Sequence, residues 1–112
     1  MKELMDKFKK AMAEVSSKKP EEMKKFGEFV GAVLKDSKLD TKTKELICVG
    51  IAVAVRCSYC IGIHVEKAFK AGATEDEIIE AGMVAVLMGG GPAYTYLTDL
   101  VEAIRMVKDT KT

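Results

Sequence analysis

The chain has 112 residues, of which 48% are hydrophobic and 31% are charged, and this is enough apolar material for one domain with a core. Its 18 Lys and Arg nearly balance its 17 Asp and Glu, so the net charge of +1 argues against a nucleic-acid or polyanion binder. The first ten residues mix charged and apolar side chains, unlike a signal peptide, and no apolar stretch reaches the roughly 20 residues that cross a bilayer. We therefore expect a cytoplasmic protein with no membrane or nucleic-acid partner.

Two helices are predicted in the N-terminal third of the chain. Apolar residues recur at helical spacing from Met1 to about Val15, and a polar connector follows over residues 16–19. Pro20 suits the first turn of a second helix, which should end near Asp36. We expect this second helix to turn its apolar side chains inward, namely Met23, Phe26, Phe29, Val30 and Val33.

The centre of the chain predicts two further helices. Asp40 or Thr41 is a suitable cap for a third helix that runs to about Val55, and its nearly continuous apolar end indicates the buried central element of the fold. A fourth helix begins near Ser58, which is itself a natural cap, and ends at Gly72.

The last third predicts two more helices, which gives six in all. Thr74 and Glu77 have the spacing of a capping box for a fifth helix that reaches about Met88. Three glycines then break the chain, and Pro92 starts a sixth helix that reaches about Val107. Without strand-like alternation of any length, the pattern predicts an all-α fold in which residues 1–112 form a single compact helical domain.

The pattern that carries chemistry is Cys57-x-x-Cys60 with His64 four residues later. At ~100° per residue, these three positions fall within ~60° of one another on a helix, so both sulfurs and the imidazole share one face. A turn near Arg56 would fold the fourth helix back on the third and place both cysteines in a helix N-terminal turn. There the free N–H groups and the helix dipole lower a thiol pKa. Glu45, on the neighbouring helix, would then approach Cys57 or His64.

The cysteine count supports redox chemistry rather than structural crosslinking. Three cysteines give no disulfide framework, and in a reducing compartment a close cysteine pair is more often catalytic or metal-binding than structural. Cys48 lies between apolar neighbours and is most simply a small core residue, so we assign it no chemical role.

The spacing Glu45-x11-Cys57-x2-Cys60-x3-His64, followed by Ala-Gly-Ala-Thr-x2-Glu-Ile over residues 71–78, resembles the AhpD-like branch of the carboxymuconolactone decarboxylase superfamily. The segment 39–47 and the later Met-Gly-Gly-Gly-Pro of residues 88–92 fit the same pattern. The resemblance covers about residues 38–93, with the two N-terminal helices over residues 1–37 outside it. It implies a six-helix fold that assembles into homo-oligomers, either trimers or hexamers. Third and fifth helices that are apolar on most faces point the same way.

The resemblance also implies an activity and roles for four residues. The AhpD-like proteins reduce alkyl hydroperoxides without a cofactor, and by resemblance Cys60 attacks the peroxide, Cys57 resolves the intermediate, and Glu45 and His64 relay protons. Their electrons come from dithiol donors, which include thioredoxin-like proteins, peroxiredoxins and lipoyl carriers. In this chain Tyr59 stands where the best-known AhpD proteins have a second histidine.

Three alternatives accompany this prediction. A dithiol–disulfide oxidoreductase without peroxidase activity would use the same cysteines. A decarboxylase of the carboxymuconolactone type would not need them, and Arg56 and Arg105 are the only arginines available for its carboxylate substrate. A non-catalytic metal-binding or scaffold protein would use Cys57, Cys60, His64 and Glu45 as zinc ligands, but structural zinc sites usually draw two ligand pairs from separate loops. We therefore expect no metal at these four residues.

Overall fold

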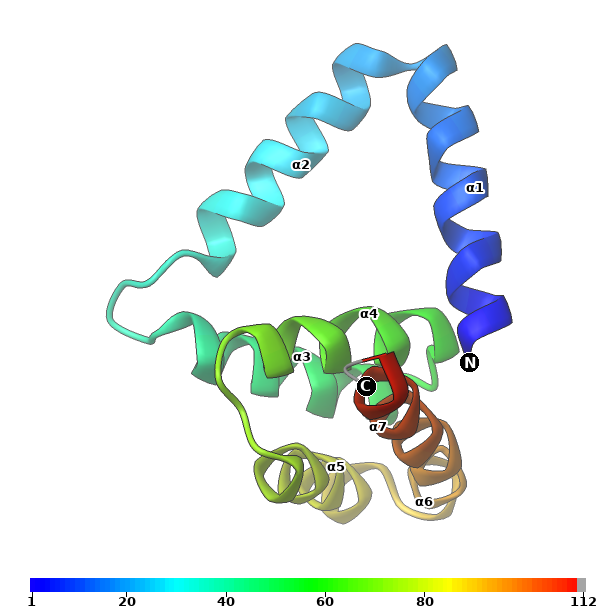
Figure 1. Cartoon of the computed structure of the whole chain (residues 1–112). Coiled ribbons are helices and arrows are strands. Elements are labelled where there is room, and N and C mark those ends of the chain that lie inside the picture. The colour runs from blue at the N-terminus through cyan, green and yellow to red at the C-terminus, as the bar shows by residue number, and fades with distance from the viewer. Residues whose placement is uncertain (111–112) are drawn as a thin grey trace.

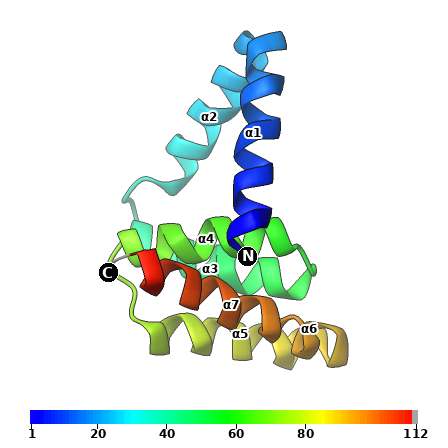
Figure 2. The ribbon, with the colours of Figure 1, turned by 45° about the vertical axis from the view of Figure 1, so that its right-hand side comes forward.

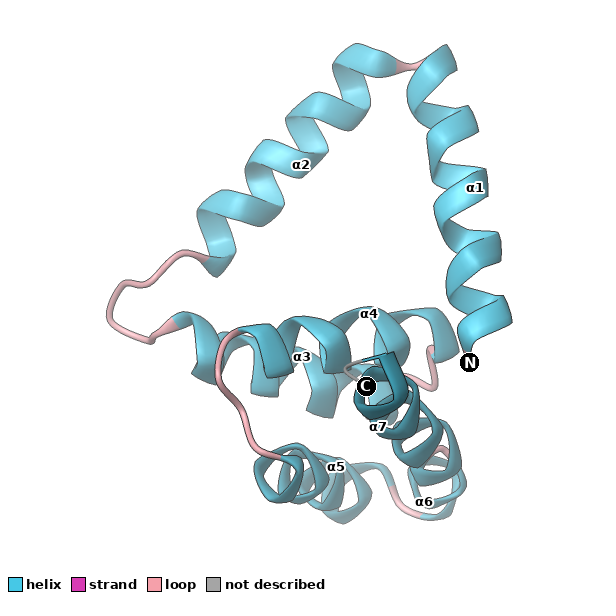
Figure 3. Ribbon diagram, viewed as in Figure 1, coloured by secondary structure: helices cyan, strands magenta, loops and turns pink. Residues whose placement is uncertain are grey.

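A computed structural model describes residues 1–110, which form seven helices and contain no strand (Figure 3). The helices are, in order, α1 (Lys2–Lys18), α2 (Pro20–Leu34), α3 (Thr41–Ala54), α4 (Ser58–Lys70), α5 (Glu75–Gly89), α6 (Gly91–Thr95) and α7 (Leu97–Thr110). The predicted all-α fold is therefore confirmed.

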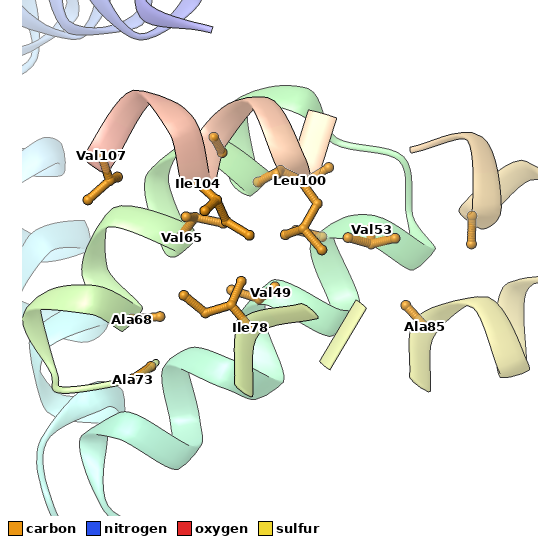
Figure 4. Close-up of a cluster of buried hydrophobic side chains, with 14 residues drawn as sticks. Val49, Val53, Val65, Ala68, Ala73, Ile78, Ala85, Leu100, Ile104 and Val107 are labelled. Atoms are coloured by element: carbon orange, nitrogen blue, oxygen red, sulfur yellow. The ribbon is translucent and has the colours of Figure 1, made fainter. Parts of the chain in front are cut away.

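The hydrophobic core lies among α3, α4, α5 and α7, with α3 packed against both α4 and α5 (Figure 1). Its largest fully buried side chains are Val49, Val53, Ile61, Val65, Ile78 and Leu100, and most of these meet in Figure 4. Each such side chain contributes roughly 1.5–3 kcal/mol by leaving water. This core confirms the central position predicted for the third helix and holds α3 and α4 in a fixed relation to each other.

A tight turn at Arg56 folds α4 back along α3. The Arg56 N–H donates to the Val53 carbonyl at 3.2 Å, and the Cys57 N–H donates to the Ala52 carbonyl at 3.0 Å, which is the Schellman arrangement of a helix end. Arg56 adopts a φ of 60°, a left-handed conformation that costs a non-glycine residue about 1–2 kcal/mol. The predicted turn near this residue is confirmed, and it brings the start of α4 back toward the end of α3.

The two N-terminal helices form an arm, residues 2–34, that stands away from the core (Figures 1 and 2). The first turns of α1 meet α4, where the buried Met5 side chain fits over Gly62 and the Phe8 ring lies 6.0 Å from that of Tyr59. At the other end, the Lys44 ammonium donates to the carbonyls of Val33 and Lys35 at 2.7 and 2.6 Å. The arm is thus fastened at both ends and free between them.

The prediction that α2 turns its apolar side chains inward is wrong. No residue of α2 is buried, and the Phe26 and Phe29 side chains are 60% and 65% exposed. Helical spacing correctly identified an apolar face, but its Phe26, Phe29 and Val33 side chains stay exposed, and of the predicted residues only Met23 and Val30 are partly buried.

Two predicted helix boundaries also differ from the structure. The first helix continues through the predicted polar connector as far as Lys18, and the Lys19 N–H still donates to the Val15 carbonyl at 2.8 Å. The predicted sixth helix is divided into α6 and α7, because the chain tightens at Tyr96, whose N–H donates to the carbonyl of Ala93 only three residues back.

Among residues 1–110, no helix combines the length and the apolar character that crossing a membrane demands.

Candidate functional site

Cys57 and Cys60 lie at the start of α4 and are joined by a disulfide, with their Cα atoms 5.2 Å apart. Cys57 is the N-cap residue, and its sulfur accepts a hydrogen bond from the Cys60 N–H at 3.2 Å. The predicted position of both cysteines in a helix N-terminal turn is confirmed. Ser58, which we expected to cap the helix, instead donates its hydroxyl to the Asp99 carboxylate on α7.

The position of the two cysteines favours the thiolate when the disulfide is reduced. Unpaired N–H groups and the positive end of the helix dipole stabilise negative charge in a first helical turn. In the disulfide state neither sulfur offers a thiolate, so the predicted alternative of a zinc site that includes both cysteines is not available in this state.

Glu45 and His64 form a pair that bridges α3 and α4. The Glu45 carboxylate is only 2% exposed, and its Oε1 lies 2.7 Å from Nδ1 of His64, a distance at which a ring N–H donates to an ionised carboxylate. Of the two approaches predicted for Glu45, the structure shows the one to His64. The pair fixes the imidazole through one nitrogen and leaves Nε2 for proton exchange.

The same helix carries the dithiol and the imidazole. His64 lies four residues after Cys60 on α4, so the two side chains share a helix face with their Cβ atoms about 5–6 Å apart. The structure therefore brings the buried carboxylate, the imidazole and the cysteine pair to one side of α4.

Cys48 also lies at this site, which sequence reasoning missed. Its sulfur, a carboxylate oxygen of Glu45 and a ring nitrogen of His64 all lie within 4.8 Å of one another. Burial raises the pKa of the Cys48 thiol, the Glu45 charge raises it further, and Lys67 opposes both effects. Cys48 is a free cysteine, and it is only half-buried, so the prediction of a simple core residue describes it incompletely. Its spacing of three residues from Glu45 is the signal that points to one helix face.

A separate groove of about 630 Å³ runs between α3 and α5. Its walls are mostly apolar and include Leu46, Ile47, Ile51, Ala81, Val84 and Met88. None of the four predicted site residues lines this groove, so it is a surface distinct from the dithiol site.

Comparison with known proteins places this arrangement among related chains. A profile of the carboxymuconolactone decarboxylase family matches residues 20–103. A family protein of known structure from Legionella pneumophila is 37% identical, with a TM-score of 0.90 over 95% of both chains. Another from Thermotoga maritima, with a suggested role in the antioxidative response, is 30% identical, with a TM-score of 0.81 over 94% of this chain and 92% of that one.

One curated relative matches over a shorter stretch. The protein described as uncharacterized protein 4 in the cox locus of Paracoccus denitrificans is 44% identical over 64 residues. The match spans 57% of this chain and 58% of that relative, which is less than two thirds of the relative's length.

Proposed function

Because the chain belongs to the carboxymuconolactone decarboxylase family and sets a Cys57–Cys60 disulfide beside a Glu45–His64 pair, we propose that it is a thiol-dependent enzyme that reduces organic hydroperoxides. The observation that carries this proposal is the contact between a buried carboxylate and an imidazole one helical turn from a redox-capable cysteine pair. The suggested antioxidative role of the Thermotoga maritima relative supports this proposal.

The proposed reaction begins with the reduced dithiol. The Cys60 thiolate attacks one peroxide oxygen, the O–O bond breaks, and the alcohol leaves with a proton supplied through His64, so that Cys60 becomes a sulfenic acid. The Cys57 thiolate then attacks the Cys60 sulfur, water leaves, and the disulfide forms. A dithiol donor, such as a thioredoxin-like protein, a peroxiredoxin or a lipoyl protein, returns both cysteines to thiols. The hydroperoxide gains two electrons and two protons, and the donor becomes the oxidised partner.

Each protein group in this scheme has a physical role. The N-terminal turn of α4 stabilises a thiolate, which matters because a thiol with an ordinary pKa of about 8.5 is only a few per cent ionised at neutral pH. Glu45 fixes His64 through Nδ1, so that Nε2 is the nitrogen that gives and takes protons. The order of attack, with Cys60 first, follows from the family resemblance.

Turnover of tert-butyl hydroperoxide with a reduced lipoyl or thioredoxin-like donor tests the activity. We expect Cys57→Ser and Cys60→Ser to abolish turnover, and His64→Gln and Glu45→Gln to lower kcat by about 10²–10⁴-fold. Glu66→Gln is the matched control, because Glu66 is partly exposed on the same helix and pairs only weakly with Lys70. Equal rates for His64→Gln and the control would contradict the proton relay.

Trapping of the sulfenic acid assigns the two cysteines. With Cys57→Ser, peroxide treatment should leave a sulfenic acid at Cys60, whereas with Cys60→Ser none should form at Cys57. The reversed pattern would exchange their roles, because Cys57 holds the N-cap position that stabilises a thiolate most directly.

A second candidate is dithiol–disulfide exchange without peroxidase activity. Tyr59 between the cysteines favours this candidate, since it supplies no second imidazole there and instead packs against Phe8 of the arm. Reduction of a disulfide substrate without any turnover of hydroperoxide would select it. Under either candidate, we place the protein in the cytoplasm, where a reducing environment regenerates the dithiol.

We also propose that the protein is a homo-oligomer, either a trimer or a hexamer. Large apolar side chains remain exposed on two surfaces, with Phe26, Phe29 and Val33 on α2 and with Ile47, Ile51, Val84 and Met88 around the groove between α3 and α5. Single exposed apolar residues are ordinary, but contiguous apolar patches mark surfaces that contact another chain.

A further inference from the structure

Three side chains of metal-ligand type converge between α3 and α4. Glu45 and Cys48 lie on consecutive turns of α3, and His64 reaches toward them from α4. We propose that Glu45, Cys48 and His64 form a binding site for a divalent transition-metal ion of the Zn²⁺ class, distinct from the Cys57–Cys60 dithiol.

The donor set matches the chemistry of zinc. A thiolate, an imidazole and a carboxylate are the three protein ligand types that Zn²⁺ takes, and three protein ligands with an open fourth position are typical of its non-structural sites. A thiolate and a carboxylate also supply two negative charges for a divalent cation. A harder cation such as Mg²⁺ or Ca²⁺ would find only one oxygen-bearing side chain in this cluster.

The distances require only small movements. Atoms bound to one tetrahedral zinc at about 2.0–2.3 Å lie roughly 3.3–3.8 Å apart, and the three donor atoms here already lie within 4.8 Å of one another. Because Glu45 Oε1 and His64 Nδ1 are 2.7 Å apart, an ion would enter by replacing their mutual contact with two bonds to the metal.

The two helices that carry the ligands are held rigidly. Val49 follows Cys48 and is fully buried, as are Ile61 and Val65 on either side of His64. Ligands on helices braced by a packed core lose little conformational freedom when an ion binds. Glu45 is buried, whereas Cys48 and His64 are only half-buried and leave the site open to solvent. Burial and the Glu45 charge raise the pKa of the Cys48 thiol while Lys67 lowers it, so an ion would bind with release of the thiol proton.

A metal ion bound at this site would also slow the dithiol chemistry, and this consequence rests on the proposed function. An ion bound to Glu45 and His64 would engage the pair that relays protons, so the metal-bound protein should turn over hydroperoxide more slowly while its Cys57–Cys60 pair stays intact. The binding itself does not depend on any activity.

Cobalt binding to the disulfide form tests the site. With Cys57 and Cys60 oxidised, Cys48 is the only free thiol, so addition of CoCl₂ should produce a near-ultraviolet thiolate-to-cobalt charge-transfer band together with visible d–d bands. Cys48→Ser should lose the charge-transfer band entirely. Glu45→Gln should weaken cobalt affinity by at least the ~10–100-fold that loss of an outer-shell partner costs. Glu66→Gln should bind as the unaltered protein does.

Protection of Cys48 from alkylation tests the same site without a variant. In the oxidised protein, ZnCl₂ should slow the reaction of Cys48 with iodoacetamide at least tenfold, as mass spectrometry of the peptide would show. No charge-transfer band with cobalt, a band that survives Cys48→Ser, or an unchanged alkylation rate would overturn the metal site. None of these results depends on peroxide turnover, so they are separable from failure of the proposed enzyme activity.

Discussion

The N-terminal arm and the core over residues 41–110 are both helical, yet the core buries many apolar side chains and the arm almost none. Ile78 and Leu100 of the core are 0% and 1% exposed, whereas Phe29 of the arm is 65% exposed. In the arm, Met5 is the one described residue that is buried. The contrast shows that helix formation and burial are separate outcomes. The exposed apolar face of α2 is one of the two surfaces on which the proposed assembly depends.

The arm and the core also differ in how the first turns of their helices are capped. In the core, α3, α4 and α5 each have a side chain that caps the first turn, from Asp40, Cys57 and Thr74. In the arm, neither α1 nor α2 has a side-chain cap hydrogen bond. A side-chain cap stabilises a helix by about 1 kcal/mol, and the two arm helices lack this local contribution.

Truncation of one core side chain should have the largest effect on stability. Ile78→Ala removes a fully buried side chain from α5 and should lower the free energy of unfolding by about 2–5 kcal/mol in urea or guanidinium titrations. Phe29→Ala is the control in the arm. Measured at a concentration low enough to suppress association, it should cost less than about 0.5 kcal/mol. Similar costs for both variants would remove the distinction between arm and core.

A charge on the apolar face of α2 should act on association instead of on folding. Phe29→Asp should convert a homo-oligomer into a 12.2 kDa monomer in light scattering, because a carboxylate cannot be buried unpaired in an apolar contact. In this variant, amide exchange of α2 should accelerate while α3 and α5 remain protected. Lys24→Asp, on an exposed position of the same helix, should leave the assembly intact. A monomeric unaltered protein at micromolar concentration would contradict the proposed assembly.

Loss of a helix cap should have a smaller effect than either the core truncation or the charge on α2. Thr74 forms a complete capping box with Glu77, and Thr74→Ala should lower the free energy of unfolding by about 1 kcal/mol. Ser17→Ala in the arm removes a hydroxyl that bonds only to the Glu14 carbonyl within its own exposed helix, so it should change stability by less than about 0.5 kcal/mol. A larger loss for Ser17→Ala than for Thr74→Ala would reverse the comparison.

Local sequence signals were enough to predict most of the core. Apolar spacing located its helices, and the Thr74–Glu77 capping box predicted the start of α5. The turn at Arg56 was predicted because only a fold-back of the fourth helix brings Glu45 near Cys57 or His64. These features depend on residues close in sequence, where periodicity and capping chemistry decide the structure.

Features that depend on distant parts of the chain were not predictable in this way. Periodicity cannot show whether an apolar face meets its own core or another chain, so Phe26 and Phe29 were placed inside. Cys57 acts as the cap in place of Ser58, because the Ser58 hydroxyl is used by Asp99, which lies 41 residues away in sequence. Cys48 was assigned to the core because its neighbours are apolar, although its side chain faces Glu45 and His64.

The proposed function requires that Cys57 and Cys60 cycle between a disulfide and a dithiol, while Cys48 stays outside the disulfide. The most direct measurement reduces the protein fully, adds one equivalent of tert-butyl hydroperoxide, blocks the remaining thiols and maps the cysteines by peptide mass spectrometry. We predict one Cys57–Cys60 disulfide with Cys48 recovered as the blocked free thiol. In a parallel sample that receives a dithiol donor before the blocking step, all three cysteines should be recovered as blocked free thiols. A main disulfide that contains Cys48, or a Cys57–Cys60 pair that remains reduced, would contradict the account.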